Sequence, residues 1–325
     1  MTCKTNTLLL RDDAQGLARA AEILRQGGLV ALPTETVYGL GADATNAAAV
    51  ARIYAAKGRP SFNPLIVHVP DLAAAEKLAQ FDDIARRLAA AFWPGPLTLV
   101  VPLRPDAPIA SLVTAGLDTL AIRVPAHPLA QKLLRAAGIP VAAPSANPSG
   151  RTSATRAQHV IAGLGGKVDA ILDGGATGIG LESTIVGCTG GQAMLLRPGG
   201  LAREEIERVL GAPLAAPSGG TVTAPGQLAS HYAPRAPVHL NAAHVAAGEA
   251  LLAFGPGPVA GQQDAKLVLN LSSTGDLLEA AANLFDFLHR LDACEATAIA
   301  VAPIPRHGLG EAINDRLARA AAPRP

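Results

Sequence analysis

The sequence has few aromatic residues, few charged residues and no long apolar run. Aromatic side chains make up 3% of its 325 residues and charged side chains 16%, whereas hydrophobic residues make up 49%. A chain this apolar does not have the composition of a disordered protein. No stretch of about 18 uninterrupted apolar residues could span a bilayer, and Met1 to Asp13 lacks the apolar core of a secretion signal. We therefore expect a soluble, globular chain without a membrane segment.

Excess charge of one sign and paired cysteines are lacking too. Lys and Arg total 27 against 26 Asp and Glu, a formal net charge of +1. This balance excludes the polybasic character that gives nonspecific nucleic-acid binding. Cys3, Cys188 and Cys294 lie far apart and form no CxxC or Cys/His metal spacing. They favour a reducing, cytoplasmic setting and predict neither a structural zinc nor any other resident metal site.

Several common catalytic motifs are absent. No GxxxxGK[ST] stretch occurs, because Gly166 and Lys167 are followed by valine, and neither HExxH nor GxSxG is found. The sequence therefore predicts no P-loop, no zinc-protease helix and no hydrolase nucleophile elbow.

Glycine and proline are plentiful, with 33 and 26 residues, and they punctuate the chain unevenly. Residues 1–210 alternate helical and strand patterns, which is typical of an α/β domain with one twisted sheet. Residues 211–237 are rich in both residues and have no periodic pattern, so they form a linker or a functional loop. Residues 238–325 again alternate strand and helix patterns, which predicts a second, smaller α/β domain.

Hydrophobic periodicity places the individual elements. Helices are predicted at 14–26, 46–57, 128–137, 154–162, 203–210, 277–291 and 308–320, with further helical stretches before residue 92. Strands are predicted at 29–32, 65–69, 97–101, 119–124, 141–143, 170–172, 184–186, 194–196, 250–254, 267–271 and 296–301.

The segment 32–41, Leu-Pro-Thr-Glu-Thr-Val-Tyr-Gly-Leu-Gly, is dense in chemical groups. It begins as a strand and breaks into a loop that carries Thr34, Glu35, Thr36 and Tyr38. Hydroxyls and backbone amides at a strand end can hold a small polar ligand. A strand–turn whose threonines bond only to local backbone explains the segment equally well.

The segment 57–68 brings two cations to a helix end, ahead of a strand that finishes in histidine. The helix dipole alone favours cations at that position. It does not explain why Asn63 and His68 bracket an apolar strand. Lys57 as a point charge and Arg59 as a planar fork suit different oxygens of a polyphosphate. His68 taken alone fits a structural histidine better than a catalyst.

Three further strand ends carry groups of the same kind. Arg123 lies in an apolar strand and needs an anionic partner if it is buried. Ser145 and Asn147 follow another strand, and Ser183 and Arg197 lie at two more. Several cations and small polar groups at strand ends together predict an anion-binding cavity.

The motifs that carry these residues resemble the Sua5/YrdC family. In chain order they are LPTETVYGLG, KGRPSFNPLIVH, WPGPLTLV, LDTLAIRVPAHP, APSANPSG, ESTIV and RPG. The resemblance covers about residues 10–237 and points to the members with an extra C-terminal domain. The stretches Ala224-Pro-Gly and His231-Tyr-Ala-Pro resemble the family's linker loop, which folds back over the active site.

The resemblance implies both a fold and a reaction. The expected fold is a YrdC-like twisted mixed sheet with flanking helices and a concave site, plus a small C-terminal Rossmann-like α/β domain. The expected reaction makes L-threonylcarbamoyl-AMP and pyrophosphate from L-threonine, bicarbonate and ATP, with Mg²⁺ assisting. This is the first step in forming N6-threonylcarbamoyladenosine at position 37 of tRNA, so the tRNA threonylcarbamoyl transferase machinery is the downstream partner. Direct tRNA binding is left open.

The resemblance also assigns site residues. Lys57 and Arg59 are the implied catalytic residues, which neutralise charge on the triphosphate. The implied ATP contacts are Arg59, Asn63, Thr119, Ser145, Asn147, Ser153, Arg197 and Tyr232. The implied threonine contacts are Thr34, His68, Arg123, Ala143 and Ser183. Two departures stand out, namely Gln227 to Ser230 inside the linker and Ala154 where many relatives have proline.

Two other functions share these features. A carbamoyl-transfer module of hydrogenase maturation has the same fold, but the zinc-finger cysteine pairs of such chains are missing here. A noncatalytic RNA-binding protein could use the same basic concavity, although a net charge of +1 argues against it.

Overall fold

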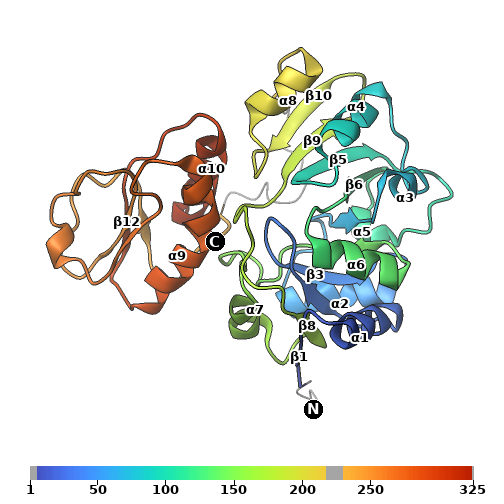
Figure 1. Ribbon diagram of the computed structural model, residues 1–325, viewed down its shortest axis with the longest axis horizontal. Coiled ribbons are helices and arrows are strands. Elements are labelled where there is room, and N and C mark those ends of the chain that lie inside the picture. The colour runs from blue at the N-terminus through green and yellow to red at the C-terminus, as the bar shows by residue number, and fades with distance from the viewer. Residues whose placement is uncertain (1–5, 217–229, 324–325) are drawn as a thin grey trace.

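The computed structural model describes residues 6–216 and 230–323, which form a larger and a smaller lobe (Figure 1). The larger lobe contains a mixed sheet with helices packed around it. The smaller lobe contains a parallel sheet whose two long helices lie between that sheet and the larger lobe. The predicted fold class is confirmed in both lobes.

Within residues 6–216, ten strands form the larger sheet. In spatial order they are β1 (Leu8–Leu10), β8 (Ala170–Leu172), β2 (Val30–Leu32), β3 (Gly39–Asp43), β7 (Val141–Ala142), β4 (Ile66–His68), β6 (Thr119–Arg123), β5 (Leu97–Pro102), β9 (Thr184–Cys188) and β10 (Ala193–Arg197). Parallel pairs such as β4 with β6 adjoin antiparallel pairs such as β4 with β7. In the parallel pair, His68 at the end of β4 lies beside Arg123 at the end of β6, so two predicted site residues lie at the carboxyl ends of neighbouring strands.

Apart from the short helix at Ser111–Thr114, which was not predicted, the helices of the larger lobe lie where apolar stripes predict them. They are α1 (Ala14–Arg25), α2 (Ala47–Lys57), α3 (Leu72–Glu76), α4 (Asp83–Phe92), α5 (Ser111–Thr114), α6 (Pro128–Ala137), α7 (Ala157–Leu164) and α8 (Arg203–Leu210). The Asn46 side chain caps α2 by accepting from two backbone amides of the first turn. Gly58 ends the same helix in the left-handed region, with φ 62°, which turns the chain toward Arg59.

Two predicted boundaries are corrected. The loop predicted through residue 41 ends earlier, because β3 begins at Gly39 and pairs antiparallel with β2. Gly41 is needed in this strand because a Cβ there would lie 2.9 Å from atoms of both Leu32 and Val141. Glycine lets the strands pack, although its low strand propensity suggests a loop. Helix α7 starts at Ala157 rather than 154, because residues 152–155 are buried and make contacts to other segments.

The smaller lobe begins with β11 (Val238–His239), which the strand predictions missed. It continues with β12 (Ala250–Ala253), the short turn η1 (Gln262–Asp264), β13 (Val268–Asn270), α9 (Leu277–Ala293), β14 (Ile299–Val301) and α10 (Leu309–Ala321). Its strands lie in the order β11-β14-β12-β13 and are all parallel.

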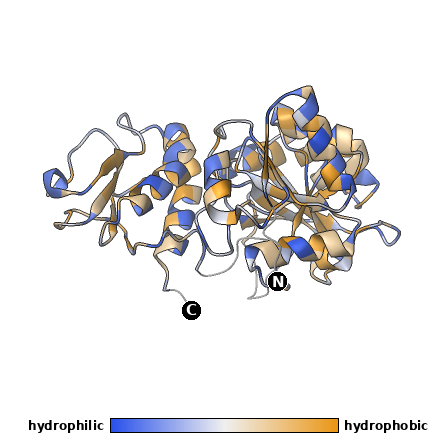
Figure 2. Cartoon of the chain, turned by 90° about the horizontal axis from the view of Figure 1, so that it is seen from below, coloured by the Kyte–Doolittle hydropathy of each residue, from blue (hydrophilic) through white to orange (hydrophobic). Residues whose placement is uncertain are grey.

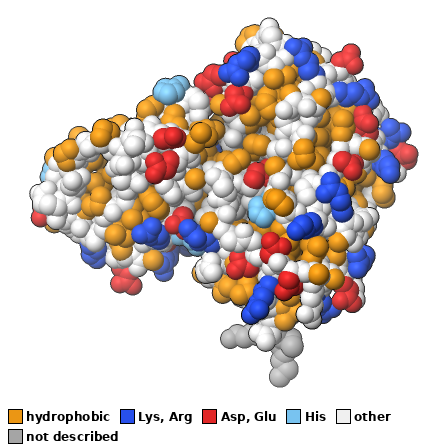
Figure 3. Space-filling model, viewed as in Figure 1, with side chains coloured by type: hydrophobic (Ala, Val, Ile, Leu, Met, Phe, Trp, Pro, Cys, Tyr) orange, Lys and Arg blue, Asp and Glu red, His pale blue; other side chains and the backbone are white. Residues whose placement is uncertain are grey.

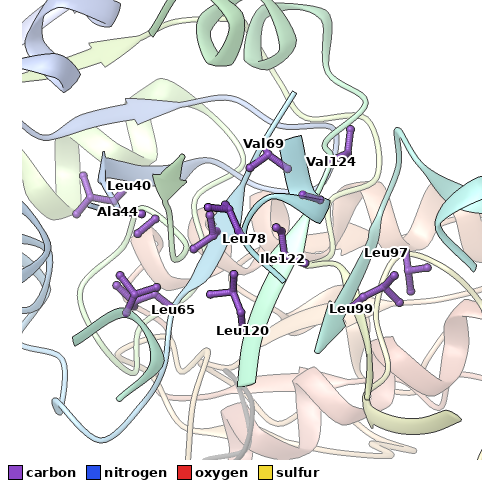
Figure 4. Packing of buried hydrophobic residues seen from close by; sticks show 14 of the residues in the cluster. Leu40, Ala44, Leu65, Val69, Leu78, Leu97, Leu99, Leu120, Ile122 and Val124 are labelled. Atoms are coloured by element: carbon purple, nitrogen blue, oxygen red, sulfur yellow. The ribbon is translucent and has the colours of Figure 1, made fainter. Parts of the chain in front are cut away.

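Buried aliphatic side chains fill the core of the larger lobe. Leu40, Leu99 and Ile122 project from strands of the sheet into one cluster, which Leu65 joins from just before β4 (Figure 4). The strands are largely hydrophobic, and hydrophilic residues lie along the outer faces of the helices (Figure 2). A second cluster crosses between the lobes, because Val37 and Leu181 of the larger lobe pack with residues of α9 and α10. The two lobes therefore share buried apolar surface.

Much of the predicted linker, 211–237, lies outside the described residues, including Gln227 to Ala229. Its described end, Ser230 to Pro237, runs between the lobes, and Tyr232 there is 1% exposed. The described residues contain no helix long and apolar enough to cross a membrane.

The core predicts a sharp difference between two apolar truncations. Ile122→Ala removes a fully buried side chain and should lower the free energy of unfolding by about 2–5 kcal/mol. Leu9→Ala truncates a side chain on edge strand β1 that is 55% exposed. It should change the free energy of unfolding by no more than about 0.5 kcal/mol. Urea denaturation of both variants tests this, and equal losses would contradict the packing described.

Candidate active site

A narrow cavity opens at the strand ends of the larger lobe, under the segment that contains Tyr232. The space in which a water molecule can be centred is about 50 Å³. Its lining comes from distant parts of the chain: Thr34, Thr36, Val37, Gly39, Arg59, Ile66, His68, Arg123, Ala143, Pro144, Ser145, Glu182, Ser183, Arg197, His231 and Tyr232. Nine residues that sequence reasoning assigned to ATP or threonine are thus brought to one place.

The loop between β2 and β3 supplies hydroxyls to one wall. The Thr34 hydroxyl lies 2.7 Å from the Thr36 hydroxyl and donates to the carbonyl of Val37 at 2.6 Å. Thr34 thus bonds to local backbone and also lines the cavity. Tyr38 points elsewhere, with its hydroxyl donating to the carbonyl of Gly175 at 2.8 Å.

Arg123 is buried at the end of β6 and has the anionic partner that burial requires. Its guanidinium donates to Glu35 at 2.6 Å, to the Thr36 hydroxyl at 2.9 Å and to the carbonyl of Gly95 at 3.1 Å. A carboxylate, a hydroxyl and a carbonyl fix its plane at the cavity wall. Such a fixed fork suits a second carboxylate, from a ligand.

His68 lies beside Arg123 and is 3% exposed. Burial, with a smaller contribution from the Arg123 charge, lowers the pKa of its imidazole to about 3. The ring is therefore neutral at ordinary pH. Its Nδ1 is buried and has no hydrogen-bond partner among the described residues.

The two cations at the end of α2 take different positions. Arg59 lines the cavity and donates to the carbonyls of Asn63, at 3.2 Å, and Pro64, at 2.9 Å. Burial lowers the pKa of Arg59 to about 10, so it stays charged at neutral pH. Lys57 lies behind the wall, and its ammonium donates to the carbonyls of Ser145 and Asn147. Lys57 therefore holds the backbone of the Ser145 loop.

Ser183 and Arg197 form the opposite wall. The Arg197 guanidinium donates to the Ser183 carbonyl at 2.8 Å, and the Ser183 hydroxyl lies 2.7 Å from that of Thr98. A Cβ at Gly199 would lie within 2.5 Å of the backbone of residues 182–184. The Arg-Pro-Gly motif thus lets the turn after β10 close onto the segment that carries Ser183.

Sequence reasoning missed Glu182 as a site residue, although the ESTIV motif contains it. Its carboxylate accepts from the Ser153 hydroxyl at 2.5 Å and from Arg316 at 2.8 Å. Arg316 and Arg197 lower the pKa of Glu182, even though burial alone would raise it. An ionised carboxylate therefore lies in a wall that is otherwise basic. Nothing in the sequence pattern links Arg316 of α10 to this motif.

Four predicted ATP contacts, and Lys57 of the predicted catalytic pair, do not line the cavity. Lys57, Asn63, Asn147 and Ser153 are buried behind its wall. The side-chain nitrogen and oxygen of Asn63 and the Oδ1 of Asn147 have no partner among the described residues. Thr119 lies at the far end of β6 from Arg123 and pairs with Pro102. The structure does not bring Thr119 to the cavity.

The residues at the cavity do not fit a resident metal ion. No group of three or more His, Cys, Asp or Glu side chains within residues 6–216 and 230–323 could hold one. Both carboxylates near the cavity, Glu35 and Glu182, are already paired with arginines. The described lining is instead suited to anions.

Two family models match the chain. One, Sua5_yciO_yrdC, described as "Telomere recombination", matches residues 22–199. The other, described as "Threonylcarbamoyl-AMP synthase, C-terminal domain", matches residues 201–322. Between them they cover both lobes.

Known proteins resemble the chain along most of its length. The threonylcarbamoyl-AMP synthase of Bacillus subtilis (strain 168) is 44% identical over 322 residues, which cover 94% of this chain and 92% of the relative. That of Pyrococcus abyssi (strain GE5 / Orsay) is 43% identical and covers 93% and 92%. A crystal structure of P. abyssi Sua5 complexed with L-threonine superposes with a TM-score of 0.88, at 40% identity and 98% coverage of both chains. The chain therefore belongs to the Sua5/YrdC family, among the Sua5-type threonylcarbamoyl-AMP synthases that carry the C-terminal domain.

Proposed function

We propose that this chain makes L-threonylcarbamoyl-AMP and pyrophosphate from L-threonine, bicarbonate and ATP, the first step of N6-threonylcarbamoyladenosine formation in tRNA. The observation that carries the proposal is one cavity lined by Arg59, Arg123 and Arg197 together with small hydroxyls. The family membership of the whole chain supports the same reaction.

The chemistry needs placement and charge neutralisation more than a protein nucleophile. The threonine amine combines with bicarbonate to give a carbamate and water. A carbamate oxygen then attacks the α-phosphorus of ATP, and the bond to the bridging oxygen breaks to release pyrophosphate. Fixed donors at the developing negative charges lower the barrier of such a transfer.

We propose that different parts of the cavity wall hold the two larger substrates. Arg123, with the neutral His68, Thr34, Ala143 and Ser183, is proposed to hold threonine, and Arg123 pairs with its carboxylate. Arg59, Ser145 and Arg197 are proposed to face the phosphates of ATP. The buried Asn63, Asn147 and Ser153 lie close behind them. Thr119, at the far end of β6, is left out of the proposed ATP contacts.

We propose a supporting part for Lys57. Its side-chain nitrogen holds the carbonyls of Ser145 and Asn147. Burial, with a smaller contribution from Arg59, lowers the pKa of Lys57 well below its ordinary value. Mg²⁺ is proposed to enter as the ATP complex, because it favours phosphate oxygens and water over all-protein sites. Tyr232 is proposed to cover the substrates, and the narrowness of the cavity means that its segment must shift for ATP to enter.

The RNA-binding alternative has less support. On the face shown in Figure 3, Lys and Arg side chains are interspersed with Asp and Glu over both lobes. A nucleic-acid surface would gather basic groups on one face.

We place the reaction in the cytoplasm and assign its product to the tRNA threonylcarbamoyl transferase machinery.

Arg59 provides the direct test. Arg59→Ala should lower kcat/KM for ATP by at least about 100-fold, since it removes a fixed charge from the developing pyrophosphate. Pyrophosphate release is measured with ATP, L-threonine, bicarbonate and Mg²⁺, and again with threonine omitted. Arg87→Ala, which changes an exposed arginine on α4, is the matched control. Release that does not need threonine would refute the reaction, and an unchanged rate for Arg59→Ala would refute its role.

The buried His68 predicts a pH dependence of stability. Its pKa is about 3 in the fold, below the ordinary value of about 6.5. Between these values the unfolded chain binds the extra proton, so stability is full above pH ~6.5 and falls as the pH drops toward 3. His68→Gln should reduce this slope by up to about 1.4 kcal/mol per pH unit. Urea denaturation at pH 7, 6 and 5 tests this, with His307→Gln, an exposed histidine, as control. Identical slopes for wild type and His68→Gln would contradict the prediction.

A further inference from the structure

Arg316 of the C-terminal helix α10 is the largest fully buried side chain of the described residues, at 1% exposure. Its guanidinium donates to Glu182 at 2.8 Å, to Asp315 at 2.6 Å and to the carbonyl of Pro198 at 2.9 Å. Its central carbon lies 5.0 Å from the centre of the Tyr232 ring, in cation–π geometry. One side chain of the smaller lobe thus contacts Glu182 and Pro198 of the larger lobe and Tyr232 of the segment between the lobes.

Glu182 poses an electrostatic problem for this cavity. It lines the same space as Arg59, Arg123 and Arg197, where the proposed substrate carries several negative charges. An unpaired carboxylate there would repel phosphate, and the repulsion is strong because water is excluded. Arg316 is the partner that removes this charge from the cavity, while Ser153 accounts for the other carboxylate oxygen.

We propose that Arg316 is a positioning residue for the reaction: it neutralises Glu182 and holds Glu182, Ser153 and the Tyr232 ring in the arrangement that accepts ATP. The inference rests on the proposed function for the identity of the anion. It gives the C-terminal domain a defined part, since α10 completes the charge balance of a cavity built by the other lobe.

Other ion pairs between the lobes do not reach the cavity. Arg203 of α8 pairs with Glu311 of α10 at 2.5 Å, and their side chains are 35% and 32% exposed. Arg156 pairs with Asp286 of α9 at 2.7 Å and is 48% exposed. Exposed pairs of this kind contribute little to stability. Arg203 therefore offers a matched control, because it joins the same helix to the same lobe without lining the cavity.

The test separates charge neutralisation from packing. Arg316→Gln leaves Glu182 without its cationic partner, so ATP affinity should fall by at least about tenfold, and KM for ATP should change more than kcat. The double variant Arg316→Gln with Glu182→Gln removes the charge and should recover affinity to within about threefold of wild type. The ATP affinity of Arg316→Lys should lie between those of the single and the double variant, because lysine keeps the charge and loses the planar fork. Arg203→Gln should match wild type.

ATP affinity is measured by calorimetry without threonine, and KM and kcat by pyrophosphate release. Recovery in the double variant supports the proposal. Wild-type affinity in Arg316→Gln, or a double variant weaker than Arg316→Gln, overturns it. If Arg316→Gln does not fold, the comparison of the double variant with Arg203→Gln decides, and a tenfold loss in the double variant overturns the proposal. A wild-type chain that binds ATP yet releases no pyrophosphate refutes the proposed function. The ATP affinities of the variants still support or overturn the role of Arg316 in that case.

Discussion

Buried arginines dominate the physics of this molecule. Arg59, Arg123, Arg197 and Arg316 are each less than 10% exposed, and a buried charge is tolerated only when acceptors surround it. The chain supplies two kinds of acceptor. Backbone carbonyls at turns and strand ends hold Arg59 and Arg197, whereas carboxylates hold Arg123 and Arg316.

This division separates two kinds of site. Arg59 is held by the carbonyls of Asn63 and Pro64 and stays charged, so it keeps its part of the phosphate wall basic. Arg123 is neutralised by Glu35 and stays fixed as a directional fork, which suits a single carboxylate. Arg316 reverses the relationship, because there the arginine cancels a carboxylate that the cavity must not expose. Charge placement therefore connects the strand ends, the segment with Tyr232 and the smaller lobe.

Sequence reasoning could predict what depends on local pattern. The α/β class and most helices and strands follow from hydrophobic periodicity. The gathering of Thr34, Arg123, Ser183 and Arg197 follows from polar groups that end apolar strands. It could not predict the pairing of Arg316 with Glu182, which are 134 residues apart. The apolar stripe of α10 predicts a buried face, but not which residue it meets. Strand β3 was not predicted for another reason: Gly41, which permits close packing in the sheet, has a low strand propensity and suggests a loop.

The most direct test of the account is the identity of the adenylate that forms. The enzyme is incubated with ATP, L-threonine, Mg²⁺ and isotope-labelled bicarbonate, and the adenylate is examined by mass spectrometry. The account holds the threonine carboxylate at Arg123, away from the α-phosphate, so it predicts an adenylate that contains threonine and the labelled carbon. An unlabelled threonyl adenylate, in which the carboxylate itself has attacked phosphorus, would contradict it.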